Sequence, residues 1–563
     1  MTAIIIIIPG PVQASRAFPF YSHEGMVVSA EPHASAAGFE VLRAGGNAAD
    51  AAAAVGFVLA ATFPSAGNLG GGGFLVYRRP DGRVFTLNYR EKAPAAASRD
   101  MFLGADGKAD PELSRRSLLA VGVPGSPAGM LETWERFGSG KLSREQILAR
   151  ALSLAEKGFA PDFGLVEGLA HEREWLSSHP STSAVFYPGG KTLEPGDTLR
   201  QPDLARTLRE IAGRGRDGFY SGWVADSLAA FMAAGGGLIT RGDLAAYRVQ
   251  ALEPVAVDYR GYRVYGMGPP SSGGMVLGQV LKLLEPFDLA AMGHNSAAYV
   301  HHLVEAERLA YADRNHYLGD PDYVEIPLAS LLSGPYLDSR RRLIPEGRAG
   351  KSLETSHGRP GPDHTTHFCV IDRWGGLAAV TTTLNGGFGM GAVVPGAGFF
   401  LNNEMDDFAA APGEPNMFGL VQGEANSVAG GKRMLSCMTP TVVTRVGGDG
   451  SEEPAFVIGA AGGSRIITTV LQVFLNLAHF GMNVREAVEA PRFHHQHLPD
   501  VVCLEPNALS ADTRRLLEGM GYALERIDHL GTASAACVLT GLESGTWYAG
   551  WADGMGVGAG TGY

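Results

Sequence analysis

A polar stretch, residues 344–364, divides the chain; it carries several Gly and Pro residues and few apolar side chains. Such a composition is typical of an exposed, mobile linker. A β-hairpin pattern follows at once: residues 366–371 read as a strand, 372–376 as a turn and 377–384 as the returning strand. We therefore expect the chain to fold around a β-hairpin that directly follows an exposed and cleavable segment, residues 344–364.

The hairpin brings three polar side chains to one end. With a turn of four or five residues, positions that face each other have numbers that sum to roughly 748 to 750. Thr365 then lies opposite Thr383, Leu384 or Asn385, and side chains on one face of a strand alternate with a period of two. We therefore expect Thr365, Thr383 and Asn385 to converge at the open end of the hairpin.

Thr365 has the chemistry of a nucleophile under one condition. A threonine hydroxyl attacks poorly until a nearby base takes its proton. Cleavage between His364 and Thr365 would give the threonine its own α-amine, whose pKa of about 7.7 to 8.0 leaves a useful fraction neutral near pH 7. Thr383 would then orient the hydroxyl. The alternative is a plain edge strand, and spacing alone favours it because Thr–Thr pairs are common.

Composition excludes several classes of protein. The chain has 563 residues, enough for a large core, and its 46 Lys and Arg against 58 Asp and Glu give a net charge of −12. An acidic chain is a poor partner for nucleic acid or an anionic membrane. No apolar run is long enough to span a bilayer. The four cysteines lie far apart, so neither a cysteine zinc site nor a disulfide framework is predicted.

Helices and strands are interleaved along the chain. Residues 33–60 read as two helices, with Asn47 and Asp50 as the capping pair of the second. Residues 296–314 read as a third helix. Short strands are expected at residues 74–78, 84–88 and 255–258. The mixture predicts a layered α and β architecture.

The first 24 residues are open to two interpretations. Residues 4–8 form a short apolar run, and residues 12–14 resemble a signal-peptidase site. No Lys or Arg precedes Arg16, so the basic start of an export signal is missing. Residues 1–24 are thus either a weak export signal or a disordered tail. The first interpretation predicts a periplasmic or secreted protein, and the second leaves a cytoplasmic one open.

Several motifs occur in order along the chain: NLGGGG at 68–73, YREKAP at 89–94, TTHF at 365–368, TTTLN at 381–385, LNNEMDDF at 401–408, LSCMTP at 435–440 and GGSR at 462–465. Together they resemble the γ-glutamyltransferase family, from about residue 25 to the C-terminal Gly-Tyr. The resemblance implies an α+β, four-layer αββα N-terminal-nucleophile hydrolase fold. It also implies that the chain cuts itself before Thr365 into a large subunit, residues 25–364, and a small subunit, residues 365–563.

The resemblance further implies a substrate and a binding site. Family members transfer the γ-glutamyl group of glutathione or glutamine to water or an amino acid, through an ester on the threonine and without a metal or organic cofactor. The guanidinium of Arg90 suits the α-carboxylate of this donor as a bidentate fork, and Ser436 adds a hydroxyl. Asp407 suits the α-ammonium group, helped by Asn385 and Glu404.

Gly462 and Gly463 are implied to form the oxyanion hole, because backbone N–H groups without a neighbouring Cβ approach a reacting carbonyl closely. Plainer alternatives exist for these positions. Arg90 and Asp407 could form surface ion pairs, and the glycines could form an ordinary turn. Without the resemblance these alternatives would be the better interpretations.

Two of the departures from the family pattern bear on the choice of substrate. Cys437 stands where most relatives have a second serine, which weakens one contact to the α-carboxylate, and Phe418 stands in place of a lid tyrosine. We expect activity with altered selectivity. The alternative function is that of a related acylase for glutaryl- or cephalosporin-type side chains. A glutaryl group lacks the α-ammonium group and would leave Asp407 without a partner. An uncut binding protein is disfavoured by the intact Thr365.

Two histidine patterns are interpreted as structural. His494, His495 and His497 are nearly consecutive and point to different sides, with no carboxylate or cysteine at ligand spacing. His301 and Glu305 are four residues apart on one helix and are expected to form a surface pair. No metal site is therefore predicted.

Overall fold

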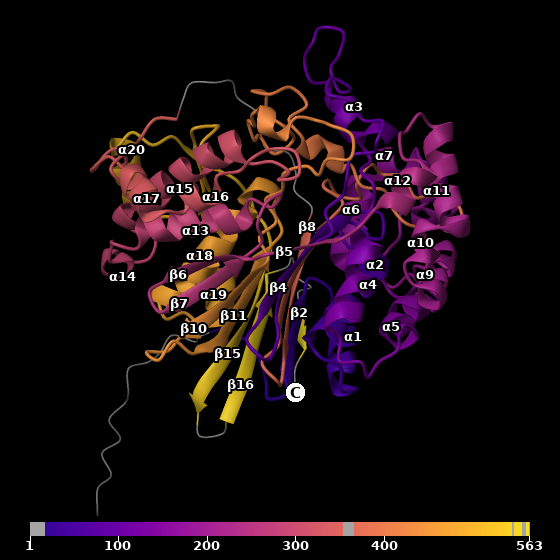
Figure 1. Cartoon of the computed structure of the whole chain (residues 1–563), viewed down its shortest axis with the longest axis horizontal. Helices are drawn as coiled ribbons and strands as arrows, with labels where there is room; N and C mark the ends of the chain where they lie inside the picture. The colour runs from indigo at the N-terminus through magenta and orange to yellow at the C-terminus, as the bar shows by residue number, and fades with distance from the viewer. Residues whose placement is uncertain (1–16, 353–364, 543–544, 554–558, 562–563) are drawn as a thin grey trace, which may run out of the picture.

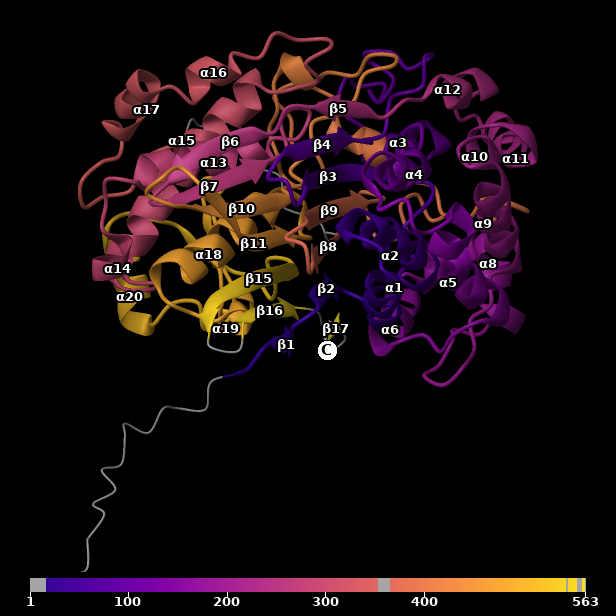
Figure 2. The ribbon, with the colours of Figure 1, turned by 60° about the horizontal axis from the view of Figure 1, so that its bottom comes forward.

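The computed structural model describes residues 17–352, 365–542, 545–553 and 559–561. Two seven-stranded sheets lie face to face at the centre of the molecule, and helices cover the outer face of each sheet (Figures 1 and 2). The layers follow the order helix, sheet, sheet, helix. The expected α+β, four-layer αββα architecture is confirmed.

The sheet that holds the hairpin is built from strands far apart in the sequence. Its strands are, in spatial order, β17 (Ala559–Thr561), β2 (Gly25–Ser29), β8 (Thr365–Asp372), β9 (Leu377–Thr383), β3 (Gly72–Arg78), β4 (Val84–Asn88) and β5 (Gln250–Leu252). Each pairs antiparallel with its neighbour. Strand β8, which begins at Thr365, therefore lies in the interior of the sheet and is not an edge strand.

The second sheet is also antiparallel and mixes early and late strands. Its order is β1 (Phe20–Ser22), β16 (Gly545–Ala552), β15 (Ala533–Leu542), β11 (Glu452–Ala460), β10 (Thr441–Val446), β7 (Tyr262–Gly266) and β6 (Val255–Tyr259). A three-stranded sheet beside it contains β12 (Phe493–His494), β13 (Val502–Leu504) and β14 (Leu524–Arg526).

Two helical layers enclose the sheets (Figure 1). The layer outside the hairpin sheet contains α1 (Pro32–Arg43), α2 (Ala48–Thr62), α3 (Pro111–Arg115), α4 (Ser126–Phe137), α5 (Arg144–Lys157), α6 (Phe163–His171), α7 (Arg173–Ser177), α8 (Pro180–Phe186), α9 (Pro202–Arg214), α10 (Asp217–Tyr220), α11 (Gly222–Ala234) and α12 (Arg241–Ala246). The opposite layer contains α13 (Gly273–Leu284), α14 (Leu289–Met292), α15 (Ala297–Tyr317), α16 (Leu328–Leu331), α17 (Gly334–Arg341), α18 (Ile466–His479), α19 (Val484–Glu489) and α20 (Ala511–Gly519).

Local signals in the sequence explain where the first helices begin. Asn47 accepts hydrogen bonds from the backbone of α2, and Asp50 closes the capping box by accepting from the Asn47 N–H. Every residue of α2 is buried, because its many alanines let the helix pack closely between the sheet and its neighbouring helices. At α15, Ser296 caps the helix by accepting from Tyr299 N at 3.2 Å.

The hairpin has the expected register. Thr365 pairs with Thr383, so facing positions sum to 748, the lower end of the range that the turn length predicts. Alternation along β8 sends Phe368 and Val370 into the core under the helices. Cys369 and Ile371 face the other way, into the core between the two sheets. Thr365 shares their face by the same period of two.

The linker begins with an anchored segment rather than a free one. Ala349 N donates to Met520 O at 2.8 Å, and Ser352 N donates to Asp500 Oδ2 at 2.8 Å. Residues 344–352 are thus held against the part of the chain that follows residue 365. The prediction of a mobile linker is therefore wrong for residues 349–352. Its remaining part, residues 353–364 with the cleavage position at His364, lies outside the described residues.

The prediction that His301 and Glu305 form a surface pair on the third predicted helix, α15, is wrong. His301 and Glu305 are both buried, because α20 and the segment after α17 cover this side of α15. The hydroxyl of Tyr522 joins them: it donates to Glu305 Oε1 at 2.6 Å and lies 2.6 Å from His301 Nδ1.

Within residues 17–352, 365–542, 545–553 and 559–561, no helix combines the length and apolar character needed to cross a membrane. The same ranges hold no group of three or more His, Cys, Asp or Glu side chains arranged to bind a metal ion. His494 instead contacts Thr468 and Gln496, and His495 contacts Asp500.

Candidate active site

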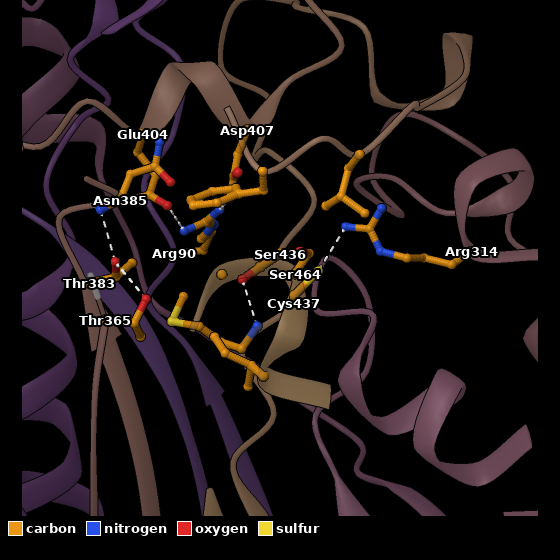
Figure 3. Close-up of a pocket in the computed structure, with 15 residues that line it drawn as sticks. Arg90, Arg314, Thr365, Thr383, Asn385, Glu404, Asp407, Ser436, Cys437 and Ser464 are labelled. Atoms are coloured by element: carbon orange, nitrogen blue, oxygen red, sulfur yellow. Dashed lines mark hydrogen bonds and ion pairs between the residues drawn. The ribbon is translucent and has the colours of Figure 1, made fainter. Parts of the chain in front are cut away.

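Thr365 opens onto a cavity of about 300 Å³ at the end of the hairpin (Figure 3). The cavity gathers nearly all the predicted site residues, namely Thr365, Thr383, Asn385, Arg90, Glu404, Asp407, Ser436, Cys437 and Gly463. They come from β8, β9, the turn after β4, and loops between later elements. The convergence predicted from the hairpin therefore extends to residues that the family resemblance supplied.

A short chain of polar groups surrounds the Thr365 hydroxyl. Thr383 Oγ1 lies 3.3 Å from Thr365 Oγ1 and accepts a 2.8 Å hydrogen bond from Asn385 N. Asn385 has a positive φ of 76°, which bends the backbone back toward Thr383. Its side-chain amide donates to Asn403 O at 3.0 Å. Asn385 thus positions Thr383, and Thr383 lies beside Thr365.

His367, two residues after Thr365, is poorly placed to act as its base. Its Nδ1 lies 2.8 Å from Thr381 Oγ1, and its Nε2 lies 3.3 Å from Cys369 Sγ. Burial lowers the pKa of His367 to about 3, so the imidazole is neutral at physiological pH. The ring packs against Gly459, where a Cβ would overlap it. This histidine fills space between the sheets and leaves the base to another group.

Arg90 forms the charged centre of the cavity. It follows β4 and is fully buried, and its guanidinium donates to Glu404 and Asp407. Both carboxylates belong to one 3₁₀ turn, Glu404–Asp407, which presents them on the same side. The predicted carboxylate-binding and ammonium-binding residues are therefore paired with one another, as buried charges require. They are not the surface ion pairs of the plainer alternative.

A third carboxylate, which sequence reasoning did not single out, lies behind this pair. Glu91 is fully buried, and its Oε2 lies 3.6 Å from Arg90 Nη1. Burial raises the pKa of Glu91 to about 7, although Arg90 opposes the shift. Burial likewise raises the pKa of Asp407 to about 6. Three carboxylates around one guanidinium thus retain protons at a pH where free carboxyl groups have lost them.

Ser436 and Cys437 lie in a backbone segment that hydrogen bonds to the chain around Pro270 and Ser272 hold in place. Ser436 N donates to Pro270 O at 2.8 Å, and Ser436 O accepts from both Ser272 N and Ser272 Oγ. The Ser436 hydroxyl accepts from Met438 N at 3.1 Å and also faces the cavity. Cys437 Sγ accepts a hydrogen bond from Arg314 Nη2 at 3.1 Å.

The two glycines lie at the start of a helix. Gly462 has a φ of 142°, and a Cβ at this position would lie 2.7 Å from Leu530 O, so the backbone conformation requires glycine. Gly463, with a φ of 53°, lines the cavity, whereas Gly462 lies just outside it. Gly463 opens a 3₁₀ turn that continues into α18, so the positive end of this helix faces the cavity. Such a site suits a developing oxyanion.

Arg314 and Ser464 also line the cavity, and sequence reasoning missed both. Arg314 lies at the last position of the predicted 296–314 helix, where it was interpreted only as helix. Ser464 was quoted only as part of the GGSR motif. The sequence shows only a polar side chain at the end of a predicted helix for Arg314, and one beside a pair of glycines for Ser464. Both patterns are too common to identify a site.

These features together define a class of protein. A threonine at the start of an interior strand, in a sandwich of two antiparallel sheets between helical layers, is the arrangement of the N-terminal-nucleophile hydrolases. Comparison with known proteins narrows the class. The family model described as gamma-glutamyltranspeptidase matches residues 34–563, and the chain belongs to this family.

Individual relatives agree with this assignment. The chain is 46% identical to the glutathione hydrolase proenzyme of Pseudomonas sp. (strain A14), over 91% of this chain and 88% of the relative. It is 44% identical to the glutathione hydrolase proenzyme of Escherichia coli (strain K12), over 92% and 89%. Among solved structures, the cephalosporin acylase from Bacillus halodurans superposes with a TM-score of 0.84 at 27% identity, covering 100% of this chain and 99% of that one.

Proposed function

We propose that the protein is an autoprocessed γ-glutamyl hydrolase and transferase, a glutathione hydrolase with Thr365 as its nucleophile. The observation that carries the proposal is the position of Thr365. Its hydroxyl lies 3.3 Å from Thr383 and faces a cavity that also contains the Arg90 and Asp407 charges. A hydroxyl nucleophile beside a cationic and an anionic group fits the acyl transfer of an amino-acid donor.

Autoprocessing supplies the missing base. Cleavage between His364 and Thr365 would divide the chain into a large subunit, residues 25–364, and a small subunit, residues 365–563. The new α-amine of Thr365 then takes the proton of the hydroxyl in the same residue. Near neutral pH a useful fraction of such amines is free to do so, because their pKa is about 7.7 to 8.0. The neutral His367 is not needed for this step.

Turnover then proceeds in two halves. Thr365 Oγ1 attacks the γ-carbonyl of glutathione or glutamine, and the oxyanion is stabilised by the backbone N–H groups at Gly462 and Gly463. The amide C–N bond breaks as the leaving amine takes the proton, which leaves a γ-glutamyl ester on Thr365. Water or an amino acid next attacks the ester, releases the γ-glutamyl product and returns the proton to the threonine hydroxyl.

The head group of the donor is recognised by charge. Arg90 and Ser436 receive the α-carboxylate, while Asp407, Glu404 and Asn385 receive the α-ammonium group. An incoming zwitterion replaces part of the internal pairing between Arg90 and its carboxylates, so the charges stay balanced. The Cys437 thiol is only a weak hydrogen-bond donor and adds little to the carboxylate contact.

The cellular compartment of the protein is proposed from the sequence of its N-terminal residues alone. We propose a periplasmic or secreted location, supported by the apolar run at residues 4–8 and the segment 12–14 that resembles a signal-peptidase site. Cell fractionation with an antibody against the small subunit tests this. Activity retained in the cytoplasm with residues 1–24 intact would count against an export signal.

A glutaryl or cephalosporin acylase is the second candidate, favoured by the structural similarity to the Bacillus halodurans acylase. The buried Asp407 disfavours it, because a glutaryl donor has no ammonium group to pair with this carboxylate. Relative rates on γ-glutamyl and glutaryl anilides decide between the two. A glutaryl anilide hydrolysed faster than the γ-glutamyl anilide would reverse the order.

One experiment tests the central proposal. Purified protein on a denaturing gel is expected to show two fragments divided near residue 364, and to release nitroaniline from L-γ-glutamyl-p-nitroanilide. Thr365→Ala is expected to give one uncut chain without activity, while Thr366→Ala serves as the matched control that still cuts. A single wild-type band, together with no release of nitroaniline, would refute the proposal.

A further inference from the structure

Arg314 is a buried cation in the wall of the cavity whose partners are all neutral. It is 1% exposed and lies near the end of α15. Its guanidinium donates to Ser272 Oγ at 3.1 Å, Asn315 Oδ1 at 2.9 Å and Cys437 Sγ at 3.1 Å. Within the described part of the chain it forms no direct ion pair with a carboxylate, although its charge acts from a distance to lower the pKa of Asp407. A buried charge without a direct counter-charge is costly, so its retention calls for an explanation.

The two arginines of the cavity differ sharply in their surroundings. Arg90 contacts Glu404 and Asp407 directly, and Glu91 lies 3.6 Å away. This side of the cavity is therefore acidic or neutral, depending on how many protons its carboxylates retain. Arg314 approaches from the opposite helical layer and is drawn at the far side of the cavity from Thr365 and Arg90 (Figure 3). A zwitterion in this field is oriented with its cation toward the acidic cluster and its anion toward Arg314.

A second, independent observation points to a ligand at the same place. The hydroxyl of Ser464 is buried, lines the cavity and has no hydrogen-bond partner in the described structure. Ser464 is drawn beside Ser436 and Cys437, between Arg90 and Arg314 (Figure 3). A buried hydroxyl left without a partner is costly, and a carboxylate oxygen would satisfy its O–H group.

We propose that Arg314 and Ser464 form a further part of the donor site, in which Arg314 supplies a second positive charge for the α-carboxylate. This inference rests on the proposed function and deepens it. Arg90 keeps part of its pairing with its acidic partners, and the substrate carboxylate is shared between the two guanidinium groups across Ser436. The donor class is thereby restricted to acyl groups that carry a carboxylate at the far end from the scissile amide.

Competitive inhibitors that differ by one group test the assignment without depending on turnover of poor donors. All three inhibitors share the carboxylate at the γ end and differ at the α-carbon. L-Glutamate carries both the α-carboxylate and the α-ammonium group. Glutarate has the α-carboxylate without the ammonium group, and 4-aminobutyrate has the ammonium group without the α-carboxylate. For the mature Arg314→Met enzyme we expect the inhibition constants of glutamate and glutarate to rise by about 100-fold. The constant for 4-aminobutyrate is expected to stay unchanged, and KM for L-γ-glutamyl-p-nitroanilide to rise far more than kcat falls.

Three further variants keep the test decisive. Arg314→Lys retains the charge and is expected to recover much of the affinity for glutamate and glutarate. Ser464→Ala is expected to weaken both inhibitors by a smaller factor, about 5-fold. Arg492→Met removes another buried arginine, one that pairs with Glu505 and Asp553, and it serves as the control for general loss of stability.

The outcomes separate this inference from the proposed function. Equal weakening of all three inhibitors in Arg314→Met, or no change in any, would assign Arg314 a structural role and overturn the inference while leaving the function intact. If Arg314→Met fails to mature, the same comparison in Arg314→Lys and Ser464→Ala decides. Wild-type protein that neither cuts itself nor binds L-glutamate would overturn both.

Discussion

Replacing Thr383 by Val removes one hydroxyl from beside Thr365 and changes the side-chain shape little. The lost oxygen accepts a 2.8 Å hydrogen bond from Asn385 N and lies 3.3 Å from Thr365 Oγ1. A buried donor left without a partner costs about 1–3 kcal/mol. The longer contact to Thr365 adds less to the resting state, because O–H···O bonds are usually about 2.7–2.8 Å. Its main effect is to hold the Thr365 rotamer for attack.

The expected loss in kcat follows from these two contacts. If the cost of about 1–3 kcal/mol is felt in the transition state, kcat falls by about 5- to 150-fold. KM for the donor is expected to change little, because Thr383 lies beside the reacting hydroxyl rather than beside the charged head group. Self-cleavage is expected to slow as well, since it uses the same Thr365 hydroxyl.

Two measurements check this prediction. Steady-state kinetics on L-γ-glutamyl-p-nitroanilide give kcat and KM of the mature variants, and a time course on a denaturing gel gives the rate of cleavage. Thr383→Ser keeps the hydroxyl and is the matched control, expected to stay within a few-fold of wild type. A Thr383→Val enzyme with wild-type kcat, or a Thr383→Ser enzyme as slow as Thr383→Val, would refute the reasoning.

Four more changes have definite outcomes. Gly462→Ala places a Cβ 2.7 Å from Leu530 O, so activity should drop about 100-fold and the melting temperature should fall; an alanine enzyme unchanged in both contradicts this. Burial raises the pKa of Glu91 to about 7 from 4.5, so its stabilising contribution is full below pH 4.5 and lost as pH rises through 7. In urea unfolding of the uncut Thr365→Ala precursor, Glu91→Gln should therefore gain stability over its parent between pH 5 and pH 8; a constant difference counts against the shift. Cys437→Ser should lower donor KM by about 2- to 12-fold, as one added hydrogen bond allows, and an unchanged KM argues against a carboxylate contact there. Phe418→Tyr should alter the ratio of kcat/KM between donors, and identical kinetics across donors would rule out selection by this side chain.

Local patterns in the sequence predicted much of the fold. The register of the hairpin depends only on the length of its turn, and the start of α2 depends on Asn47 and Asp50 three residues apart. Such features are decided by neighbours in sequence. The layered architecture and the identity of Thr365 needed more, because a threonine at the start of a strand is common. The ordered motifs supplied that information.

Features decided by distant packing were not predicted. Arg314 enters the cavity only because α15 packs beside the segment that contains Cys437, more than a hundred positions later in the chain. The buried state of His301 depends on Tyr522 in the same way. The shifted pKa of Glu91 depends on burial and on carboxylates from the 3₁₀ turn at 404–407. Contacts of this kind join residues far apart in the sequence, so they produce no periodicity and no fixed spacing from which they could be predicted.

Both large sheets interleave strands from the two sides of the cleavage point. In the hairpin sheet β8 and β9 lie between β2 and β3, and in the other sheet β16, β15, β11 and β10 lie between β1 and β7. Neither fragment therefore has a complete sheet or core of its own. Before the cut, refolding is a first-order reaction of one chain. After the cut it requires two chains to meet, so its rate depends on concentration and the entropy of association adds to the barrier. Cleavage thus makes the mature protein far harder to rebuild once it has unfolded.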